Sequence, residues 1–181
     1  VVVYALSNDT TFTDADFQAA FPQVFPQLKG AWIAATNVDV LGPIGGSQTY
    51  TRVSAPCGQA GPYCLAADGF LVRGPTWADG TAAYNTYAVG TGTSFVAPMI
   101  SGAIAILAEA FPTSPPSVWR DRLLATADNS FFPHTGVTTF ANGYQHGYNL
   151  EFGHGIFDLW KALQPITASG QTRVFVGKSV G

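Results

Sequence analysis

Residues 89–98 read Val-Gly-Thr-Gly-Thr-Ser-Phe-Val-Ala-Pro, and no other stretch says as much about the architecture. A strand-like segment, residues 84–89, runs into small residues and then into Ser94. Residues 94–110 are apolar on nearly every face, which is typical of a central helix. Pro98 falls within its first two turns, where a missing N–H is tolerated. The stretch therefore predicts a hydroxyl group at the N-terminal mouth of a buried helix.

Composition narrows the class of protein. Of the 181 residues, 47% are hydrophobic and only 10% are charged, well below the roughly one quarter usual in soluble proteins. The length suffices for one domain with a sizeable core, and the scarcity of charge indicates a surface that meets a partner or belongs to a larger globule. The net charge is −3 and no basic run is present, which argues against nucleic acid as a partner.

Membrane and export signals are weak. The best candidate span, residues 95–111, is shorter than about 18 residues and carries Glu109, so we expect no transmembrane helix. The first residues, Val-Val-Val-Tyr-Ala-Leu, have no basic flank and no starting Met, so we expect no signal peptide. We expect the chain to have been processed or cut from a longer one.

The order of elements favours an α/β fold with a mainly parallel sheet, because buried strands alternate with helices. The expected strands are 1–5, 31–38, 50–53 and 64–66, and the expected helices are 94–110, 114–127 and 159–163. Prolines interrupt residues 21–27, which we expect to be irregular. Residues 13–20 read as a weak helix or loop, 69–86 as a loop-rich crossing, and 129–150 as a loop or small hairpin.

Cys57 and Cys64 are the only cysteines and enclose Gly-Gln-Ala-Gly-Pro-Tyr. So short and turn-rich a separation is easily closed by a disulfide, and two buried free thiols are the alternative. Two cysteines are too few for a structural zinc site. A disulfide would indicate an oxidising compartment.

Two roles are consistent with Ser94: it could cap the helix, or it could be a nucleophile. A serine hydroxyl becomes reactive when a base takes its proton and nearby donors stabilise the oxyanion. Free N–H groups at a helix N-terminus supply such donors, and the small Gly92 and Thr93 let a substrate carbonyl approach. Other motifs fit less well: the segment lacks the third glycine of a dinucleotide site, the Gly-Lys-Ser/Thr of a P-loop, and the glycine two residues after the serine of an α/β-hydrolase elbow.

The string Gly92-Thr-Ser-Phe-Val-Ala-Pro98, continued by Ser-Gly-Ala at 101–103, closely resembles the nucleophile motif of the subtilisin-like serine proteases. Met99 stands where that family usually has His, and Phe95 where many members have Met. Residues 1–9 resemble the family strand that ends in Ala-Gly-Asn, with Ser7 in place of Gly. Asn8 on its own would read as a turn residue, but beside the serine motif it matches the oxyanion asparagine.

Two further segments extend the resemblance over residues 1–164. Residues 57–69 are similar to the Cys-Gly…Cys-x-Ala-Ala-Pro-Gly segment of bacterial autotransporter subtilases, with Asp68 in place of Pro. Residues 152–158 resemble the closing Gly-x-Gly turn that leads into the family's last helix. Residues 165–181 read as a tail or a linker to a further region, such as a translocating barrel.

The resemblance implies a serine endopeptidase acting on protein or peptide substrates. Ser94 would be the nucleophile, and Asn8 and the Ser94 backbone N–H would stabilise the oxyanion. Ser7 and Asp9 would help to wall the primary specificity pocket, and Thr93 would lie beside the substrate carbonyl. The family is secreted, so we expect a secreted, periplasmic or cell-surface protein.

Two members of the family's catalytic triad are missing from this sequence. The triad order is Asp, His, Ser, and the first two precede the strand that carries the asparagine, which here opens the chain. His134, His146 and His154 all follow Ser94, and we expect surface or hydrogen-bonding roles for them. The chain is therefore expected to be the C-terminal part of a subtilisin-like domain, inactive and poorly folded without its N-terminal part.

Two other functions stay open. The chain could be a non-catalytic subtilisin-like module of a larger surface protein, or an unrelated serine hydrolase that uses a downstream histidine. We expect no cofactor. Calcium is common in the family, and the candidate ligands Asp9, Asp14, Asp16 and Asp39 have no spacing that defines a calcium loop, so we assign no metal.

Overall fold

A four-stranded sheet organises the part of the chain that the computed structural model describes, residues 1–43, 45–76 and 86–166. Its central strand is β2 (Trp32–Leu41), which pairs in parallel with β1 (Val2–Ala5) on one side and β4 (Cys64–Asp68) on the other. β3 (Thr49–Arg52) pairs antiparallel with the second half of β2. The expected mainly parallel sheet is confirmed, and β2 runs beyond the expected residue 38 because β3 supplies it with a partner there. The register aligns Val3 with Ile33, Ala35 with Leu65, Asn37 with Ala67, and Val38 with Arg52.

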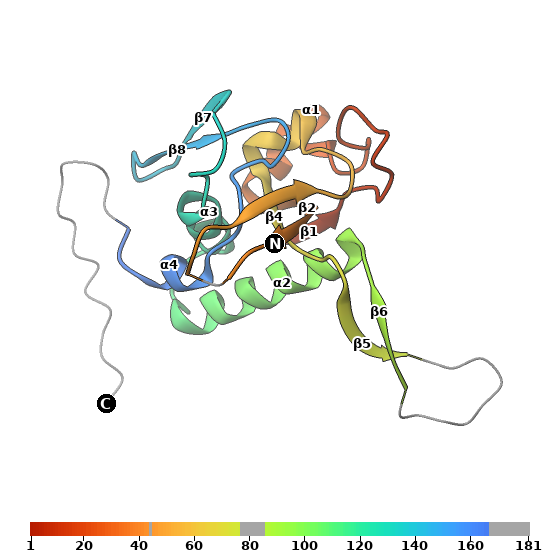
Figure 1. Ribbon diagram of the computed structural model, residues 1–181. Coiled ribbons are helices and arrows are strands. Elements are labelled where there is room, and N and C mark those ends of the chain that lie inside the picture. The colour runs from red at the N-terminus through yellow and green to blue at the C-terminus, as the bar shows by residue number, and fades with distance from the viewer. Residues whose placement is uncertain (44, 77–85, 167–181) are drawn as a thin grey trace, which may run out of the picture.

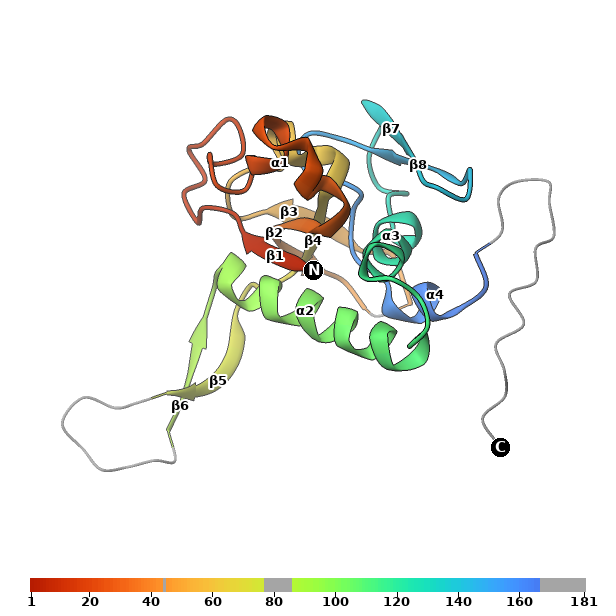
Figure 2. The ribbon, with the colours of Figure 1, turned by 180° about the vertical axis from the view of Figure 1, so that it is seen from behind.

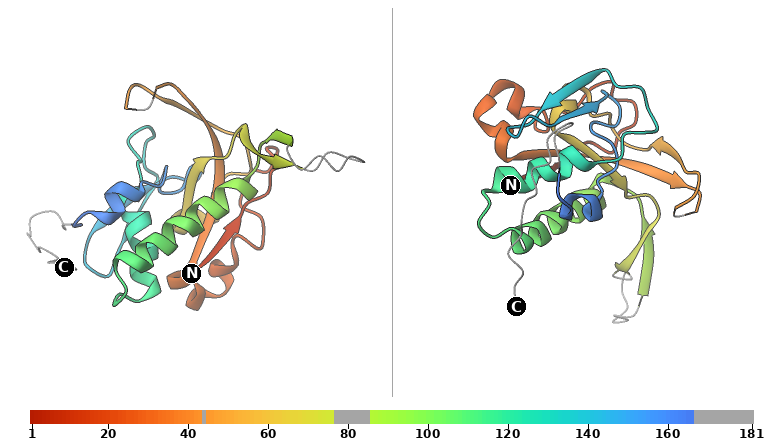
Figure 3. Two further views of the ribbon diagram at one scale, coloured as in Figure 1. Left: turned by 90° about the horizontal axis from the view of Figure 1, so that it is seen from below. Right: turned by 90° about the vertical axis from the view of Figure 1, so that its left-hand side faces the viewer.

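Three helices cover one face of the sheet (Figures 1 and 2). They are α2 (Thr93–Ala110), α3 (Pro116–Thr126) and α4 (Leu159–Leu163). Figure 3 shows α2 lying along the sheet, with α3 and α4 close to its C-terminal half. The buried stripe of α2 comprises Val96, Ile100, Ala103 and Leu107, and it packs in one cluster with Ile33, Ala35, Leu65 and Ala67 of the sheet. Each fully buried large side chain contributes about 1.5–3 kcal/mol, so this cluster anchors the helix.

The outer face of α2 is exposed among the described residues, although the sequence predicts a helix surrounded on nearly all sides. The exposed residues are Ser94, Pro98, Ser101, Gly102, Ala105, Ile106, Glu109 and Ala110. By length and composition alone α2 could cross a membrane, a test that the core helix of a globular protein also passes. Its packing against the sheet is that of a core helix.

The other face of the sheet is covered by short helical turns. These are α1 (Phe21–Val24) and two 3-10 helices, η1 (Pro26–Ala31) and η2 (Gly58–Tyr63). The prediction of irregular structure over residues 21–27 was wrong, because the prolines lie in the first turn of α1 and of η1, where no N–H is needed. Residues 13–20 form turns rather than a helix.

Two hairpins complete the described structure. β5 (Val72–Thr76) pairs antiparallel with β6 (Thr86–Gly90), and this arm projects from the body at the start of α2 (Figure 1). The expected loop over residues 69–86 was therefore partly wrong, and residues 77–85 lie outside the described part. β7 (Gly136–Thr139) and β8 (Gln145–Tyr148) form the hairpin expected within residues 129–150.

A disulfide joins Cys57 to Cys64, as the sequence favoured. Both cysteines are fully buried, with their Cα atoms 5.9 Å apart. The bond closes η2 into a small loop at the start of β4. The prediction about residues 165–181 stays a prediction, since residues 167–181 lie outside the described part of the chain.

Candidate active site

Ser94 lies in the first turn of α2, where β6 passes into the helix. Gly92 caps the helix in an extended conformation, with φ 166° and ψ 157°. Its N–H donates to the carbonyl of Gly69 at 3.0 Å, and its carbonyl accepts from the N–H of Phe95 at 3.0 Å. The Ser94 side chain is exposed. The predicted hydroxyl at a helix mouth is therefore present, and the N–H groups of its two neighbours, Thr93 and Phe95, already have partners.

Asn8 is held against this turn by Thr93. The Thr93 N–H donates to Asn8 Oδ1 at 2.9 Å, and the Thr93 hydroxyl lies 3.1 Å from the same oxygen. The Thr93 hydroxyl also donates to the carbonyl of Leu6 at 2.6 Å. These bonds occupy Asn8 Oδ1 and leave the Nδ2 donor free to face elsewhere. Thr93 is only 2% exposed and its side chain points inward, so its role as a substrate contact stays a prediction.

The side chains of Asn8 and Ser94 flank one small space beside Gly92. A Cβ atom built on Gly92 would lie 3.2 Å from Ser94 Oγ and 3.3 Å from both Nδ2 and Oδ1 of Asn8, and Oδ1 is already bonded to Thr93. A donor and a hydroxyl that face the same point at this distance could receive a carbonyl oxygen and attack its carbon. Glycine keeps that point empty. The structure thus brings together the two residues that the sequence singled out for catalysis.

Ser7 and Asp9 flank Asn8 at the exposed end of β1. The Ser7 N–H donates to Asp16 Oδ2 at 2.8 Å, and the Asp9 N–H donates to Ser7 Oγ at 3.2 Å. The hydroxyl and the N–H of Thr11 both bond to the Asp9 carboxylate and lower its pKa. Asp9 therefore stays ionised in this loop. Both residues lie beside Asn8 in the chain, and their predicted role in the specificity pocket stays a prediction.

No base accompanies Ser94 among the described residues, where Ser94 Oγ makes no hydrogen bond to any residue. His134 is exposed, while His146 and His154 are only 8% and 0% exposed and bond to each other. A surface role was wrong for these two histidines, and the expected hydrogen-bonding role is confirmed. Burial lowers the pKa of His154 to about 3 and also lowers that of His146. The histidine-dependent hydrolase finds no support in these contacts.

Two of the candidate calcium ligands, Asp14 and Asp16, accept hydrogen bonds from protein groups. Asp14 accepts from the N–H groups of Ala15 and Gln59, and Asp16 accepts from Ser7 and Ala19. Within residues 1–43, 45–76 and 86–166, no three His, Cys, Asp or Glu side chains are grouped so as to hold a metal ion. The calcium question stays at the level of the sequence prediction.

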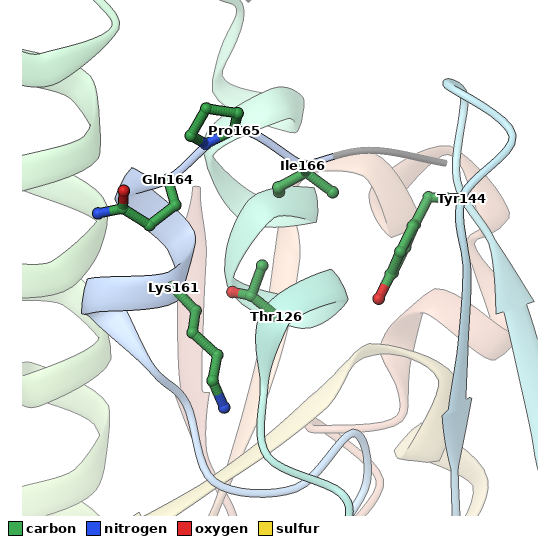
Figure 4. A pocket seen from close by; sticks show the side chains of 6 residues that line it. All are labelled: Thr126, Tyr144, Lys161, Gln164, Pro165 and Ile166. Atoms are coloured by element: carbon green, nitrogen blue, oxygen red, sulfur yellow. The ribbon is translucent and has the colours of Figure 1, made fainter. Parts of the chain in front are cut away.

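Two surface cavities lie away from Ser94. One, of about 240 Å³, is formed by the ends of α3 and α4 and by the β7–β8 hairpin region (Figure 4). Its lining residues are Thr126, Tyr144, Lys161, Gln164, Pro165 and Ile166. The other, of about 380 Å³, lies between the C-terminal part of the sheet and α4, next to Asp68, Asp128 and Asp158. Neither is lined by Ser94 or Asn8.

Sequence reasoning missed one polar residue beneath this site. Asn37 is fully buried on β2, and its Oδ1 accepts the N–H of Gly69 at 2.8 Å. The available signal was a break in pattern, because Thr36 and Asn37 interrupt the apolar run of β2. The Thr93 contacts with Asn8 and Leu6 had no such signal, because they join residues 85 and 87 positions apart.

Comparisons with known proteins place this geometry in a family. The fold is shared with fervidolysin from Fervidobacterium pennivorans, a keratinolytic enzyme related to subtilisin, at 23% identity and a TM-score of 0.61 over 92% of this chain and 22% of that one. It is shared with the patellamide maturation protease PatG at 18% identity and a TM-score of 0.58, over 90% of this chain and 42% of that one. It is also shared with the self-cleaved protease domain of PatA at 17% identity and a TM-score of 0.57, over 90% of this chain and 49% of that one.

The chain spans less than half of the length of each of these three proteins. At such low identities the likeness shows the fold alone. A comparison with curated proteins finds no match. The family model of the subtilases, peptidase family S8, matches residues 1–155, which is most of the sequence. The chain belongs to the subtilase family.

Proposed function

We propose that the chain is the C-terminal part of a subtilisin-like serine endopeptidase, with residues 1–164 contributing to the catalytic domain. One observation carries the proposal: Ser94 Oγ and Asn8 Nδ2 lie within 3.3 Å of the same empty point beside Gly92. A nucleophile and an oxyanion donor need this arrangement around a scissile carbonyl. Family membership supports the reaction class.

In the proposed reaction Ser94 Oγ attacks the carbonyl carbon of a peptide bond while a histidine takes the hydroxyl proton. The carbonyl oxygen becomes an oxyanion, which accepts hydrogen bonds from Asn8 Nδ2 and from the Ser94 N–H. The tetrahedral intermediate then expels the amine, which takes its proton from the histidine, and leaves an acyl group on Ser94. Water, deprotonated by the same histidine, hydrolyses this ester and restores the serine.

The histidine and its partner aspartate are proposed to come from an N-terminal part of the same catalytic domain. Supporting this, Ser94 Oγ has no base among the described residues, and none of the three histidines bonds to it. The free edge of β1 supports it too: β1 pairs only with β2 in the described sheet, and Val2 is 47% exposed. An apolar parallel strand is normally covered on both sides.

The outer face of α2 is the second surface that the N-terminal part is proposed to cover. Its exposed positions are mostly small, including Ser101, Gly102 and Ala105. A Cβ built on Gly102 would meet no atom within 4 Å, although glycine inside a helix costs about 1 kcal/mol relative to alanine. A glycine at this position would allow another element to pack closely against α2, which would offset the loss of helix stability.

A fluorophosphonate probe tests the reaction, because it labels only an activated serine. We expect labelling at Ser94 in the full-length protein, none in residues 1–181 alone, and none in full-length Ser94→Ala. Full-length Ser101→Ala is the matched control, since Ser101 is an exposed serine of the same helix whose hydroxyl bonds to the Ala97 carbonyl. Absence of labelling and of peptide hydrolysis in the full-length protein would refute the endopeptidase.

A non-catalytic subtilisin-like module is the second candidate function. The observation that favours it is the unpartnered Ser94 hydroxyl. The same experiment separates the two candidates, because a binding module would resist the probe in every form. The upstream sequence is an independent check, since the endopeptidase requires an aspartate and a histidine motif there.

We further propose a secreted, periplasmic or cell-surface location, with autotransporter subtilases as the most similar kind of protein. The buried Cys57–Cys64 bond supports an oxidising compartment. Thiol alkylation of the isolated protein in denaturant and without a reductant, followed by mass spectrometry, tests this. Modification of Cys57 and Cys64 without prior reduction would contradict the proposed location.

A further inference from the structure

A polar side chain occupies an apolar row beneath the nucleophile. Ile33, Ala35 and Asn37 face the same side of β2, because alternate residues of a strand share a face. The first two pack in the cluster that anchors α2, and Asn37 is also 0% exposed. Burying an amide costs about 1–3 kcal/mol unless its groups are bonded. An asparagine at this position therefore calls for a specific partner.

That partner is the backbone that supports Ser94. Asn37 Oδ1 accepts the N–H of Gly69 at 2.8 Å, and the Gly69 carbonyl accepts the N–H of Gly92 at 3.0 Å. Gly92 precedes Ser94 by two residues and its carbonyl begins the hydrogen bonding of α2. Two successive bonds thus connect the core of the sheet to the turn, residues 91–94, that presents the nucleophile.

The three segments fit too closely to shift independently. A Cβ built on Gly69 would lie 2.7 Å from the Gly92 carbonyl oxygen, 2.7 Å from Val96 Cγ2 and 2.8 Å from Asn37 Oδ1. Real Cβ atoms do not approach so closely, so this position requires glycine. Without the amide oxygen, the Gly69 N–H would lose its hydrogen bond and the Gly69 backbone could move. The hydrogen bond from the Gly92 N–H to the Gly69 carbonyl would then weaken as well.

Of the Asn37 side-chain atoms, only the amide oxygen makes a hydrogen bond. Among residues 1–43, 45–76 and 86–166, Asn37 Nδ2 is buried and has no hydrogen-bond partner. The Asn37 backbone N–H donates separately to Ser54 Oγ at 2.9 Å. Removal of the amide oxygen should therefore change the position of the turn at residues 91–94.

We propose that Asn37 is a positioning residue, which holds the 91–94 turn through Gly69 so that Ser94 and Asn8 face the same substrate carbonyl. This inference rests on the proposed function. Asn37 does not touch the reacting atoms. Displacing a reactive group by about 1 Å can lower the reaction rate by about 10²-fold. Loss of the hydrogen bond from Gly69 to Asn37 should therefore lower kcat.

Kinetics in the full-length protease test the proposal. Asn37→Ala should lower kcat by about tenfold or more and leave KM within about twofold. Val38→Ala is the matched control, because Val38 is equally buried on the same strand, in a cluster away from α2. It should lower stability while kcat stays within about twofold. An equal fall of kcat in both variants would overturn the proposal.

Asn37→Asp separates positioning from packing. A neutral carboxyl group has the shape of the amide and keeps the acceptor oxygen, and burial raises the pKa of a carboxyl group. Because the carboxyl group keeps an acceptor for the Gly69 N–H, kcat of Asn37→Asp at low pH, where the group is neutral, should exceed that of Asn37→Ala by about tenfold. Equal kcat in the two variants at low pH would overturn the role of the amide oxygen.

Amide hydrogen exchange provides a readout that does not need activity. The Gly69 and Gly92 N–H groups should exchange about tenfold faster or more in Asn37→Ala than in Val38→Ala. A full-length protein without peptidase activity, but with this exchange pattern, would refute the proposed function and leave the structural link standing. Equal exchange in both variants would overturn the link itself.

Discussion

The Nδ1 atoms of His146 and His154 lie 2.9 Å apart inside the molecule. His154 Nε2 lies 3.2 Å from the Thr138 hydroxyl, and His146 Nε2 lies 3.1 Å from the Ala127 carbonyl. His154 Nε2 also lies 3.2 Å from the Pro62 carbonyl, so the two rings connect Thr138 and the end of η2 to the end of α3. The pair ties the β7–β8 hairpin to the end of α3 and to the loop that follows β8.

This pair should make the protein less stable in acid. Burial lowers the pKa of His154 to about 3 and lowers that of His146, whereas an unfolded histidine titrates near 6.5. Below about pH 6.5 the unfolded state therefore binds more protons than the folded state, and stability falls as pH falls. Each such histidine contributes about 1.4 kcal/mol per pH unit. Denaturant unfolding at pH 7 and pH 5 should show a loss of about 2 kcal/mol or more.

The matched variants for this pH effect are His146→Gln and His134→Gln in the full-length protein. His134 is exposed and lies outside the pair. Loss of one titrating ring should flatten the pH dependence in His146→Gln and leave it unchanged in His134→Gln. The same slope in both variants would show that other groups cause the acid sensitivity.

Gly92→Ala should strongly lower activity with little loss of stability. The new methyl group would fill the point that lies 3.2 Å from Ser94 Oγ and 3.3 Å from Asn8 Nδ2, where the substrate oxygen is expected. The extended backbone at Gly92 suits alanine, so the free energy of unfolding should change by less than about 1 kcal/mol. We expect kcat/KM to fall by about 10²-fold or more. Gly74→Ala, where the methyl group meets no atom within 4 Å, should retain activity.

Asn8 should matter for rate and not for substrate affinity. Removing one oxyanion donor typically lowers kcat by about 10²–10³-fold, and we expect this range for Asn8→Ala with KM nearly unchanged. Asn8→Asp keeps an oxygen for the Thr93 N–H and replaces the Nδ2 donor with an acceptor. It should be as slow as Asn8→Ala while unfolding like the wild type. Wild-type kcat in Asn8→Asp would exclude Nδ2 as the donor.

Replacing both Cys57 and Cys64 with alanine should lower the free energy of unfolding by about 2–3 kcal/mol. The bond closes a short loop, and loop-closure entropy for so few residues gives about 2.5 kcal/mol. Thermal unfolding of the variant and of reduced wild type measures the effect. Because the bond lies away from Ser94, the kcat of folded variant should be unchanged. Equal stability of oxidised and reduced protein would contradict this account.

Local patterns in the sequence predicted the parts of the fold that depend on neighbouring residues. The buried strand from Trp32, the apolar helix from Thr93, the helix Leu159–Leu163 and the Cys57–Cys64 pair all follow from composition and spacing. The β5–β6 pairing was missed because Arg73, Gly74 and Pro75 interrupt the strand pattern, and only β6 provides β5 with its hydrogen bonds.

The residues of the candidate site also fall into those that local sequence predicted and those that it did not. Ser94 was evident from its own string of residues, and Asn8 from a strand end that resembles a family motif. Asn37 acts across the sheet on Gly69, 32 residues later, so nothing near it in the chain reveals its role. The hydrogen-bonding role of His146 and His154 was predicted, but their burial was not, because it depends on the packing of the β7–β8 hairpin against the end of α3.

The two Thr93 bonds, to Leu6 and to Asn8, also govern when a reactive site can exist during synthesis. They join residues 87 and 85 positions apart, which a ribosome adding about 5–20 residues per second needs roughly 4–17 s to produce. Until Thr93 has emerged, Asn8 has no neighbour to orient it and the serine has not yet been made. The Asn8–Ser94 arrangement can therefore form only after residues 1–94 have all been synthesised.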